Sequence, residues 1–273
     1  MMNHLRRSPA TWILGSLLVA GISGCTSPVG IDDDDTSSTS AAVSDGTADF
    51  THTGVGAIVY RSGGHTYVDC SGFLVSPTVF VTAAHCKDPT NPNPPYVTFD
   101  QNVTDQSPLH SGTIYIHPDY PQRNNGDIAD VGVFVLDQPV SGYQISRLPT
   151  RNQLDTLRHH QLVYGANIRV VGYGRDRVAR QETQPTGQRI SGNVGYHSFN
   201  SGYVMASQLA VQGYSGVCFG DSGGPDYFTV NGQEIAISLN QSISDPYCQT
   251  DAWLERLDTD VARSFLGNYV TLP

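Results

Sequence analysis

The stretch Gly220-Asp221-Ser222-Gly223-Gly224-Pro225 decides the fold once its position in the chain is taken into account. It contains the pattern Gly-x-Ser-x-Gly, which places a serine on a sharp turn where glycines let another backbone approach closely. Ser222 is therefore a candidate nucleophile. The pattern alone fits more than one fold, and the chain order of the residues that would activate the serine distinguishes these folds.

An α/β-hydrolase needs its catalytic histidine after the nucleophile. All nine histidines of this chain precede Ser222, and the last of them is His197. The order His, Asp, Ser instead finds a histidine in Thr82-Ala83-Ala84-His85-Cys86, directly after an apolar run. The sequence thus favours a fold in which His85 lies upstream of the nucleophile.

The composition favours short strands joined by turns. The 273 residues include 28 Gly and 16 Pro, and only 15% are charged. The expected strands are Gly54–Tyr60, Gly72–Val75, Val79–Thr82, Thr113–Ile116, Val131–Leu136, Ile168–Val171, Arg189–Val194, Tyr203–Met205 and Glu234–Leu239. Strands and helices do not alternate, so we expect an all-β barrel or sandwich. Near the end, Thr259 can cap a helix that places Val261, Phe265, Leu266 and Tyr269 on one face.

The first 24 residues predict a cleaved export signal, because Arg6 and Arg7 precede an apolar run that is too short to span a bilayer. Ile22-Ser23-Gly24-Cys25 resembles the lipobox of bacterial lipoproteins, in which the cysteine carries lipid and becomes the new N-terminus. An ordinary cleavage site with an incidental Cys25 is the alternative. Residues 25–50 are rich in Ser, Thr, Asp and Gly and predict a flexible tether or pro-segment, which leaves 51–273 as the folded domain.

Charge and cysteine content restrict the possible partners. The formal charge of −10 offers no basic surface, so we expect no nucleic-acid partner. If Cys25 carries lipid, an even number of cysteines remains, and in an exported chain these four cysteines predict two disulfides. These four are Cys70, Cys86, Cys218 and Cys248, and their spacing leaves three pairings open. None stands in a Cys-x-x-Cys pair, and we expect no metal and no cofactor.

Five short motifs together resemble the landmarks of the chymotrypsin/trypsin family of serine peptidases, in order and in spacing. They are Cys70-Ser71-Gly72-Phe73-Leu74, Thr82–Cys86, His117-Pro118-Asp119-Tyr120, Gly172-Tyr173-Gly174 and Gly220–Pro225, and they span nearly all of residues 50–273. The resemblance implies two antiparallel six-stranded β-barrels with the active site in the cleft between them, followed by a C-terminal α-helix. It also implies a serine endopeptidase that cleaves proteins or peptides through an acyl-enzyme.

Two aspartates compete for the acid of the implied triad. The run from Asp130 through an apolar strand to Pro139-Val140 resembles the family pattern without gaps. Asp127 matches only its first three positions and would put the charged Asp130 inside the strand. We therefore predict Asp130 as the triad acid, and Asp127 as a turn residue.

The resemblance also implies roles for the other residues. His85 would accept the proton of the Ser222 hydroxyl, Asp130 would fix the His85 tautomer, and the N–H groups of Gly220 and Ser222 would bind the oxyanion. The implied disulfides are Cys70–Cys86, which would brace the loop of His85, and Cys218–Cys248, beside the specificity pocket.

Activation and specificity are where the match departs. In the family, a freed N-terminus pairs with the aspartate before the nucleophile, here Asp221. No clear Ile-Val-Gly-Gly start is present, but Val43-Ser44-Asp45-Gly46 stands at about the right distance before Cys70. Either cleavage after Ala42 frees Val43, or Asp221 finds another partner and the enzyme works while tethered.

For specificity, Gly216 stands where trypsins carry an aspartate at the base of the pocket for the P1 side chain. Its lack of charge argues against a simple Lys or Arg preference, although Asp251 or Ala252 could line the same pocket. Ser238-Leu239-Asn240 resembles the substrate-binding strand, with Asn240 in place of the usual glycine, which would narrow the pocket. We expect a small or medium uncharged P1 residue.

We expect a monomer that is exported to the bacterial cell envelope, held on the membrane through lipid on Cys25, or released. A rival hypothesis from another class is a catalytically silent relative that serves as an envelope binding module. The intact set of His85, Asp130 and Ser222 gives that hypothesis little support.

Overall fold

The computed structural model describes residues 43, 45–120, 129–158, 160–175 and 185–273. The predicted signal, Cys25, most of the predicted tether and Asp127 lie outside these residues. Among the described residues, no helix combines the length and the apolar character that crossing a bilayer requires. The described chain is mostly β-structure, as predicted.

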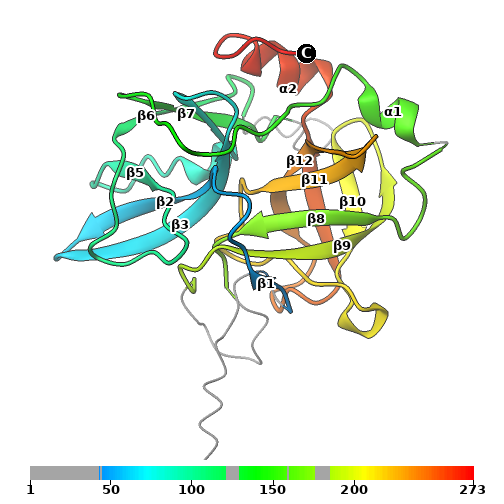
Figure 1. The fold of residues 1–273 in the computed structure, drawn as a ribbon, viewed down its shortest axis with the longest axis horizontal. Coiled ribbons are helices and arrows are strands. Elements are labelled where there is room, and N and C mark those ends of the chain that lie inside the picture. Colours follow the sequence, from blue (N-terminus) through cyan, green and yellow to red (C-terminus); the bar gives the residue numbers. More distant parts are fainter. Residues whose placement is uncertain (1–42, 44, 121–128, 159, 176–184) are drawn as a thin grey trace, which may run out of the picture. The chain divides into compact units, whose positions relative to one another are not determined.

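A six-stranded antiparallel sheet forms the first half of the domain, in the order β5-β2-β3-β4-β7-β6 (Figure 1). Its strands are β2 (Val55–Ser62), β3 (His65–Leu74), β4 (Val79–Thr82), β5 (Pro95–Thr98), β6 (Gly112–Ile116) and β7 (Gly132–Leu136). The two outer strands approach each other at one bridge, between Val97 and His110. With only this bridge between its two edges, the first barrel is only partly closed. Phe73, Phe80 and Phe134 are fully buried in its core.

The second half is a closed six-stranded antiparallel barrel, because β8 pairs with both β9 and β11. Its strands are β8 (Asn167–Gly172), β9 (Ile190–Phe199), β10 (Tyr203–Ser207), β11 (Pro225–Val230), β12 (Gln233–Ile243) and β13 (Asp251–Arg256). Ile168, Ile190 and Ile237 are fully buried in its core. The predicted architecture of two β-barrels is confirmed, with the difference that one of them is open along most of its edge.

The last residues of the predicted tether pack on the second barrel. The short strand β1 (Thr47–Ala48) pairs with β9, and Val43 is fully buried in the core of that barrel. These residues are ordered because Val43 packs in the core of the second barrel and β1 pairs with β9. The polar composition of the segment did not indicate this packing. The domain boundary at residue 50 stays a prediction.

The helices are short. They are the 3₁₀ turns η1 (Ala84–Cys86) and η2 (Ala210–Gln212) and the α-helices α1 (Gln153–Leu157) and α2 (Asp260–Leu266). The predicted cap of α2 is confirmed, since Thr259 Oγ1 accepts a hydrogen bond of 3.2 Å from the N–H of Ala262. Phe265 and Leu266 are buried against the body.

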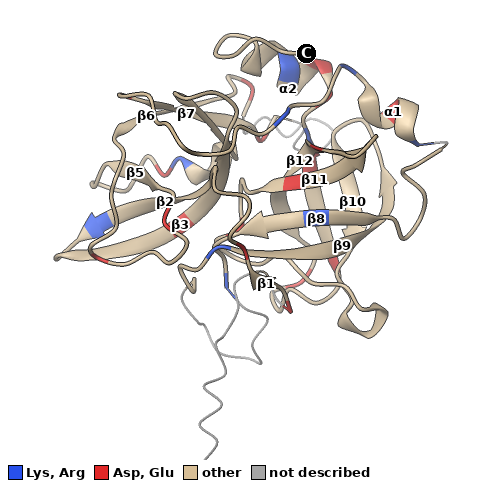
Figure 2. Cartoon of the chain, in the orientation of Figure 1, with Lys and Arg blue, Asp and Glu red and all other residues tan. Residues whose placement is uncertain are grey.

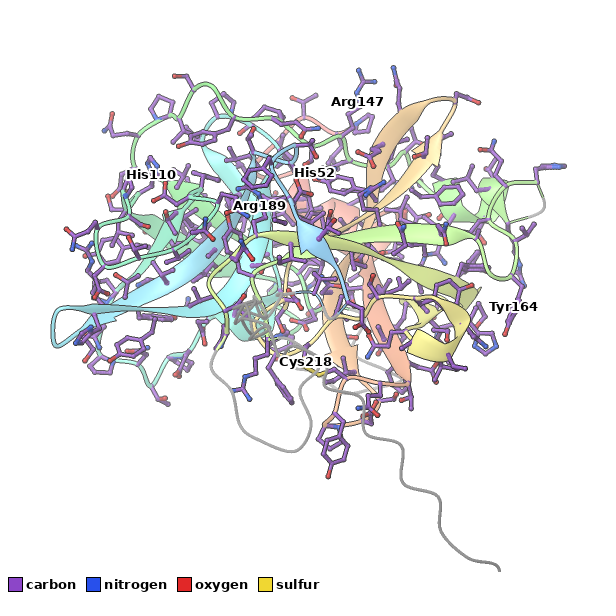
Figure 3. The ribbon with its side chains drawn as sticks, turned by 60° about the horizontal axis from the view of Figure 1, so that its bottom comes forward. His52, His110, Arg147, Tyr164, Arg189 and Cys218 are labelled. Atoms are coloured by element: carbon purple, nitrogen blue, oxygen red, sulfur yellow. A yellow bond between two sulfur atoms is a disulfide. The ribbon has the colours of Figure 1, made fainter. Side chains whose placement is uncertain are left out.

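A buried arginine joins the two barrels. The guanidinium of Arg189 donates to the carbonyl oxygens of Val55 and Phe99 and to the hydroxyl of Tyr173, each at 3.0 Å. Arg189 directly precedes β9 of the second barrel, and it lies near the centre of the view in Figure 3. Because Val55 and Phe99 belong to the first barrel, these bonds fix the barrels relative to each other and thereby the cleft between them.

Candidate active site

The histidine and the aspartate of the predicted triad are in direct contact. His85 lies in η1 directly after β4, and Asp130 stands two residues before β7. The Asp130 carboxylate accepts two bonds from His85, one from ring atom Nδ1 at 2.7 Å and one from the main-chain N–H at 2.9 Å. Since β4 and β7 are paired, the register of the first barrel brings these residues together. Asp130 therefore contacts His85, and its role as the triad acid stays a prediction.

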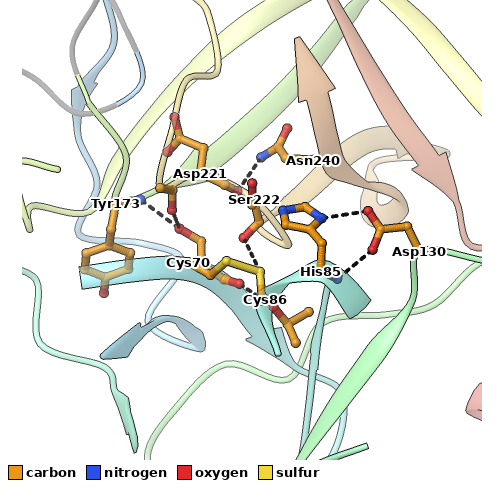
Figure 4. The surroundings of a disulfide bond; sticks show 11 residues. Cys70, His85, Cys86, Asp130, Tyr173, Asp221, Ser222 and Asn240 are labelled. Atoms are coloured by element: carbon orange, nitrogen blue, oxygen red, sulfur yellow. Dashed lines mark hydrogen bonds and ion pairs between the residues drawn. A yellow bond between two sulfur atoms is a disulfide. The ribbon is translucent and has the colours of Figure 1, made fainter. Parts of the chain in front are cut away.

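The surroundings of His85 favour its protonated form. Burial opposes charge on the imidazole, but the hydrogen bond and the charge of Asp130, helped by the charge of Asp69, outweigh burial and raise the His85 pKa above its ordinary value. The imidazole lies between Asp130 and Ser222 in Figure 4. Ser222 and His85 line the same cavity. The site can therefore place a hydroxyl beside a base that a carboxylate orients.

The loop that carries Ser222 has a backbone that requires glycine. Gly220 has a φ of +99°, and a Cβ atom there would lie 2.9 Å from Gly174 Cα. The carbonyl oxygen of Phe219 accepts a hydrogen bond of 2.9 Å from the N–H of Arg175. In a trans peptide the next N–H points to the opposite side, so this bond turns the N–H of Gly220 away from Arg175. The N–H of Gly220 is therefore held in one orientation.

Ser71 supports this loop from the first barrel, and the sequence analysis missed it. Its N–H donates to the carbonyl oxygen of Ser222, and its hydroxyl donates to that of Gly220, both at 2.8 Å. The hydroxyl also accepts from the N–H of Tyr173 at 2.9 Å. The only sequence signal for Ser71 was its position next to Cys70. A single serine in a strand does not indicate that its side chain will bond to a distant loop.

Asp221 is fully buried behind the nucleophile. Its carboxylate accepts hydrogen bonds from the N–H groups of Gly174 at 2.8 Å and Cys218 at 2.9 Å. Burial outweighs these bonds and raises the Asp221 pKa to about 7. A Cβ atom at Gly172 or Gly174 would overlap this carboxyl group, which explains the glycines of the Gly172-Tyr173-Gly174 motif.

Val43 lies against the segment that leads to Asp221. A Cβ atom at Gly192 would meet both Ser215 and Val43, and the Ser215 hydroxyl donates to the carbonyl oxygen of Asp45 at 3.2 Å. Ser215 precedes Cys218, whose N–H binds Asp221. The structure thus brings Val43 and the Asp221 loop into one packed region.

A cavity of about 750 Å³ is lined by two of the predicted catalytic residues, His85 and Ser222, while Asp130 is buried behind His85. One of its walls runs from Val217 to Gly220, and another runs from Asn240 to Pro246. His85, Ser222, Arg175, Pro185 and the segment Val68–Cys70 complete the lining.

The sequence predicted that Ser238, Leu239 and Asn240 bind substrate, but the part of β12 that lines the cavity begins only at Asn240. Ser238 and Leu239 are fully buried and do not line the cavity, whereas Gln241, Ser242 and Ile243 do. The reason is the register of β12. Asn240 pairs with the nucleophile loop, donating from its N–H to Gly224 and accepting at its carbonyl from Gly223, and the chain first reaches the cavity at this residue. A bulge between Asn240 and Ser242 adds to the shift.

The predicted base of the P1 pocket is not in the lining. Gly216, Asp251 and Ala252 are absent from the cavity wall, and Val217 takes its place there. Asp245 does line the cavity, but its carboxylate accepts bonds from the N–H groups of Tyr247, Gln249 and Thr250 and from the Thr250 hydroxyl. These bonds bind the Asp245 carboxylate to its own loop.

Both implied disulfides are present, Cys70–Cys86 and Cys218–Cys248. The sulfur atoms of the first pair and a nitrogen of His85 lie within 4.8 Å of one another. The sulfurs are bonded to each other, so this group offers no thiolates to a metal. The disulfide instead ties η1, and with it His85, to β3.

The two β-barrels define a chymotrypsin-like fold, and His85, which contacts Asp130, lines one cavity with Ser222. The family model described as Trypsin matches residues 46–244, and the chain belongs to the trypsin family. It is 27% identical over 208 residues to chymotrypsin-like elastase family member 1 of Bos taurus, covering 70% of this chain and 74% of that one. The same protein of Rattus norvegicus is 28% identical over 208 residues, and that of Homo sapiens is 27% identical over 206.

Proposed function

We propose that the protein is a serine endopeptidase that hydrolyses peptide bonds through an acyl-enzyme. The observation that carries this proposal is the contact of Asp130 with both the ring and the main-chain N–H of His85, which lines the same cavity as Ser222. The elastase names of its relatives fit the same activity.

The proposed reaction uses each group once in acylation and once in deacylation. Ser222 Oγ attacks the scissile carbonyl while His85 Nε2 takes the hydroxyl proton, and Asp130 stabilises the imidazolium. The N–H groups of Gly220 and Ser222 bind the oxyanion. His85 then protonates the leaving amine, and the peptide bond breaks. A water molecule repeats the sequence on the ester, which frees the acid product and restores the serine hydroxyl.

A fluorophosphonate label tests this proposal. We expect the wild-type protein, after limited proteolysis if needed, to be labelled on Ser222, and Ser222→Ala to be unlabelled. Ser201→Ala, an exposed serine outside the cavity, is the control and should be labelled like wild type. Failure of the wild type to react would favour the silent binding module.

We infer that cleavage after Ala42 activates the enzyme by freeing the amino group of Val43. Two observations support this inference. Val43 is buried beside the segment that leads to Asp221, and within the described residues the Asp221 carboxylate takes part in none of the ion pairs with Lys, Arg or His. An α-ammonium there would stabilise the carboxylate. N-terminal sequencing of active protein tests this, because any other N-terminus on fully active material would support activity in the tethered form.

For P1, we propose a small or medium uncharged side chain. Val217 and Ile243 line the cavity, and the Asp245 carboxylate is bound within its own loop. A peptide library read by mass spectrometry tests this preference. Dominant cleavage after Arg or Lys would overturn it.

We further propose export and lipid attachment at Cys25. Two disulfides in the folded part support an oxidising compartment. Metabolic labelling with a fatty-acid probe should mark the wild type and leave Cys25→Ala unmarked. Labelling of neither protein would favour an ordinary signal cleavage and release.

A further inference from the structure

The cavity carries a charged group that the reaction does not use. Asp69 lies in β3, directly before Cys70, and lines the cavity that holds His85 and Ser222. Its side chain reaches solvent, because position 69 is exposed.

We propose that Asp69 makes the leaving-group side of the cleft select substrates with Lys or Arg in the first two residues after the scissile bond. This inference rests on the proposed peptidase function. It names a specificity-determining residue that lies on the side of the cleft opposite to the P1 pocket.

The geometry of the cavity assigns Asp69 to that side. The wall from Val217 to Gly220 carries one of the proposed oxyanion donors, and we infer that the acyl part of the substrate lies along this wall and the wall after Asn240. His85 must give its proton to the leaving amine, which therefore departs past the imidazole. The disulfide Cys70–Cys86 lies against that imidazole, and Asp69 is the residue next to it.

Asp69 is free to bind a cation from the substrate. Within the described ranges, its carboxylate takes part in none of the ion pairs with Lys, Arg or His. Figure 2 shows that basic residues are few along the described ribbon. Burial raises the Asp69 pKa, the like charge of Asp88 adds to this, and His85 opposes it. A cation bound here would relieve the repulsion between the two carboxylates.

The nearest basic groups do not compete for the same position. Arg175 also lines the cavity, and its guanidinium lies 5.1 Å from the centre of the Phe219 ring. Lys87 is exposed beyond the disulfide and does not line the cavity. Within the described residues Asp69 forms an ion pair with neither of these groups, so a cationic side chain of the leaving group is drawn to it.

Acyl transfer measures this preference without involving P1. The protein is acylated by one ester substrate, and argininamide or citrullinamide competes with water for the acyl group. Citrulline has nearly the same shape as arginine but carries no charge on its side chain. We expect wild type to transfer to argininamide about threefold to fivefold more efficiently than to citrullinamide, as an exposed ion pair allows, and the ratio to fall toward one in 1 M salt.

Variants assign the preference to Asp69. Asp69→Asn should bring the argininamide-to-citrullinamide ratio close to one, and Asp69→Lys should invert it. Asp137→Asn, an exposed acid of the first barrel outside the cavity, should keep the wild-type ratio. Equal transfer by wild type, or a preference that survives in Asp69→Asn, overturns the inference. A protein that forms no acyl-enzyme would instead contradict the proposed function, so the two failures are distinguishable.

Discussion

The hydroxyl of Ser71 donates a 2.8 Å hydrogen bond to the carbonyl oxygen of Gly220, across the junction of the two barrels. The first barrel thereby holds the peptide that follows the Gly220 N–H, while the second barrel supplies the nucleophile. The loop with the two proposed oxyanion donors, Gly220 and Ser222, is therefore held by a residue outside its own barrel.

Ser71→Ala should weaken both stability and catalysis. The variant leaves the Gly220 carbonyl and the Tyr173 N–H without a buried partner, which typically costs about 1–3 kcal/mol each when no water replaces the hydroxyl. Denaturant unfolding should show a lower free energy of unfolding, and kcat should fall because the Gly220 N–H is less well held. The control is Ser201→Ala. An unchanged midpoint and kcat would show that the hydroxyl is dispensable.

The choice between Asp130 and Asp127 can be tested by kinetics. Asp130→Asn should lower kcat roughly 10⁴-fold, as expected when the orienting carboxylate of a Ser-His-Asp triad is lost. Asp127→Asn should stay within about twofold of wild type, since a surface substitution outside the triad, as predicted for Asp127, contributes little. Equal losses in both variants would contradict the assignment of Asp130.

The pH profile should report the charge of Asp69. Protonated His85 cannot act as a base, so kcat/KM should fall as the pH drops through the raised His85 pKa. Asp69→Asn removes a negative charge that favours the imidazolium, so the acidic limb should move to lower pH. The measurement is kcat/KM of a neutral substrate between pH 5 and 9, with Asp137→Asn as the control. A limb that stays in place would show that Asp69 does not act on His85.

Cleavage at Val43 should change how stability depends on pH. Asp221 has a folded pKa of about 7, above its unfolded value, so it favours folding fully at low pH, and this contribution is lost as the pH rises from about 4 to 7. The uncleaved protein should therefore lose stability over that range. Pairing with a freed α-ammonium would remove the loss. We expect thermal unfolding to show a larger advantage of the cleaved over the uncleaved form at pH 8 than at pH 5, and no such change in Asp221→Asn.

A second His–Asp pair should act as a structural ion pair. His52 lies buried between Asp49 Oδ2 at 2.5 Å and Glu234 Oε2 at 3.0 Å, and it stacks on Tyr227 (Figure 3 labels His52). Burial opposes its charge, but Asp49 and then Glu234 outweigh burial and raise the His52 pKa. This stabilisation is present below the unfolded pKa of His52 and is lost as the pH rises through the folded one.

His52→Gln should therefore destabilise the protein by about 3 kcal/mol at pH 6, because it leaves Asp49 buried without its cation, and by less at pH 9. Denaturant unfolding at the two pH values measures this difference. His197→Gln, an exposed histidine, should have little effect at either pH. An equal loss at both values would mean that His52 acts by packing alone.

The sequence analysis did not predict several strands, and β13 illustrates a physical reason for this. β13 contains Glu255 and Arg256, which are buried, and a buried pair of charged residues does not resemble a strand of a barrel core. Arg256 is stabilised by Asp258 and Asp155, which lies 101 positions away in the chain. Such partners exist only in the folded state, so no local pattern indicates them.

The sequence by itself determined the class of fold, both disulfides and the capped helix α2, and it supplied His85, Asp130 and Ser222 as the proposed catalytic residues. These features follow from chain order, spacing and local chemistry, which a sequence records directly. Only the tertiary structure decided that Asn240 ends the buried part of β12, that Ser71 holds the nucleophile loop, and that Asp69 faces the cleft. Which face a strand residue presents depends on pairing register and bulges, and these are set by contacts between strands that lie far apart in the chain.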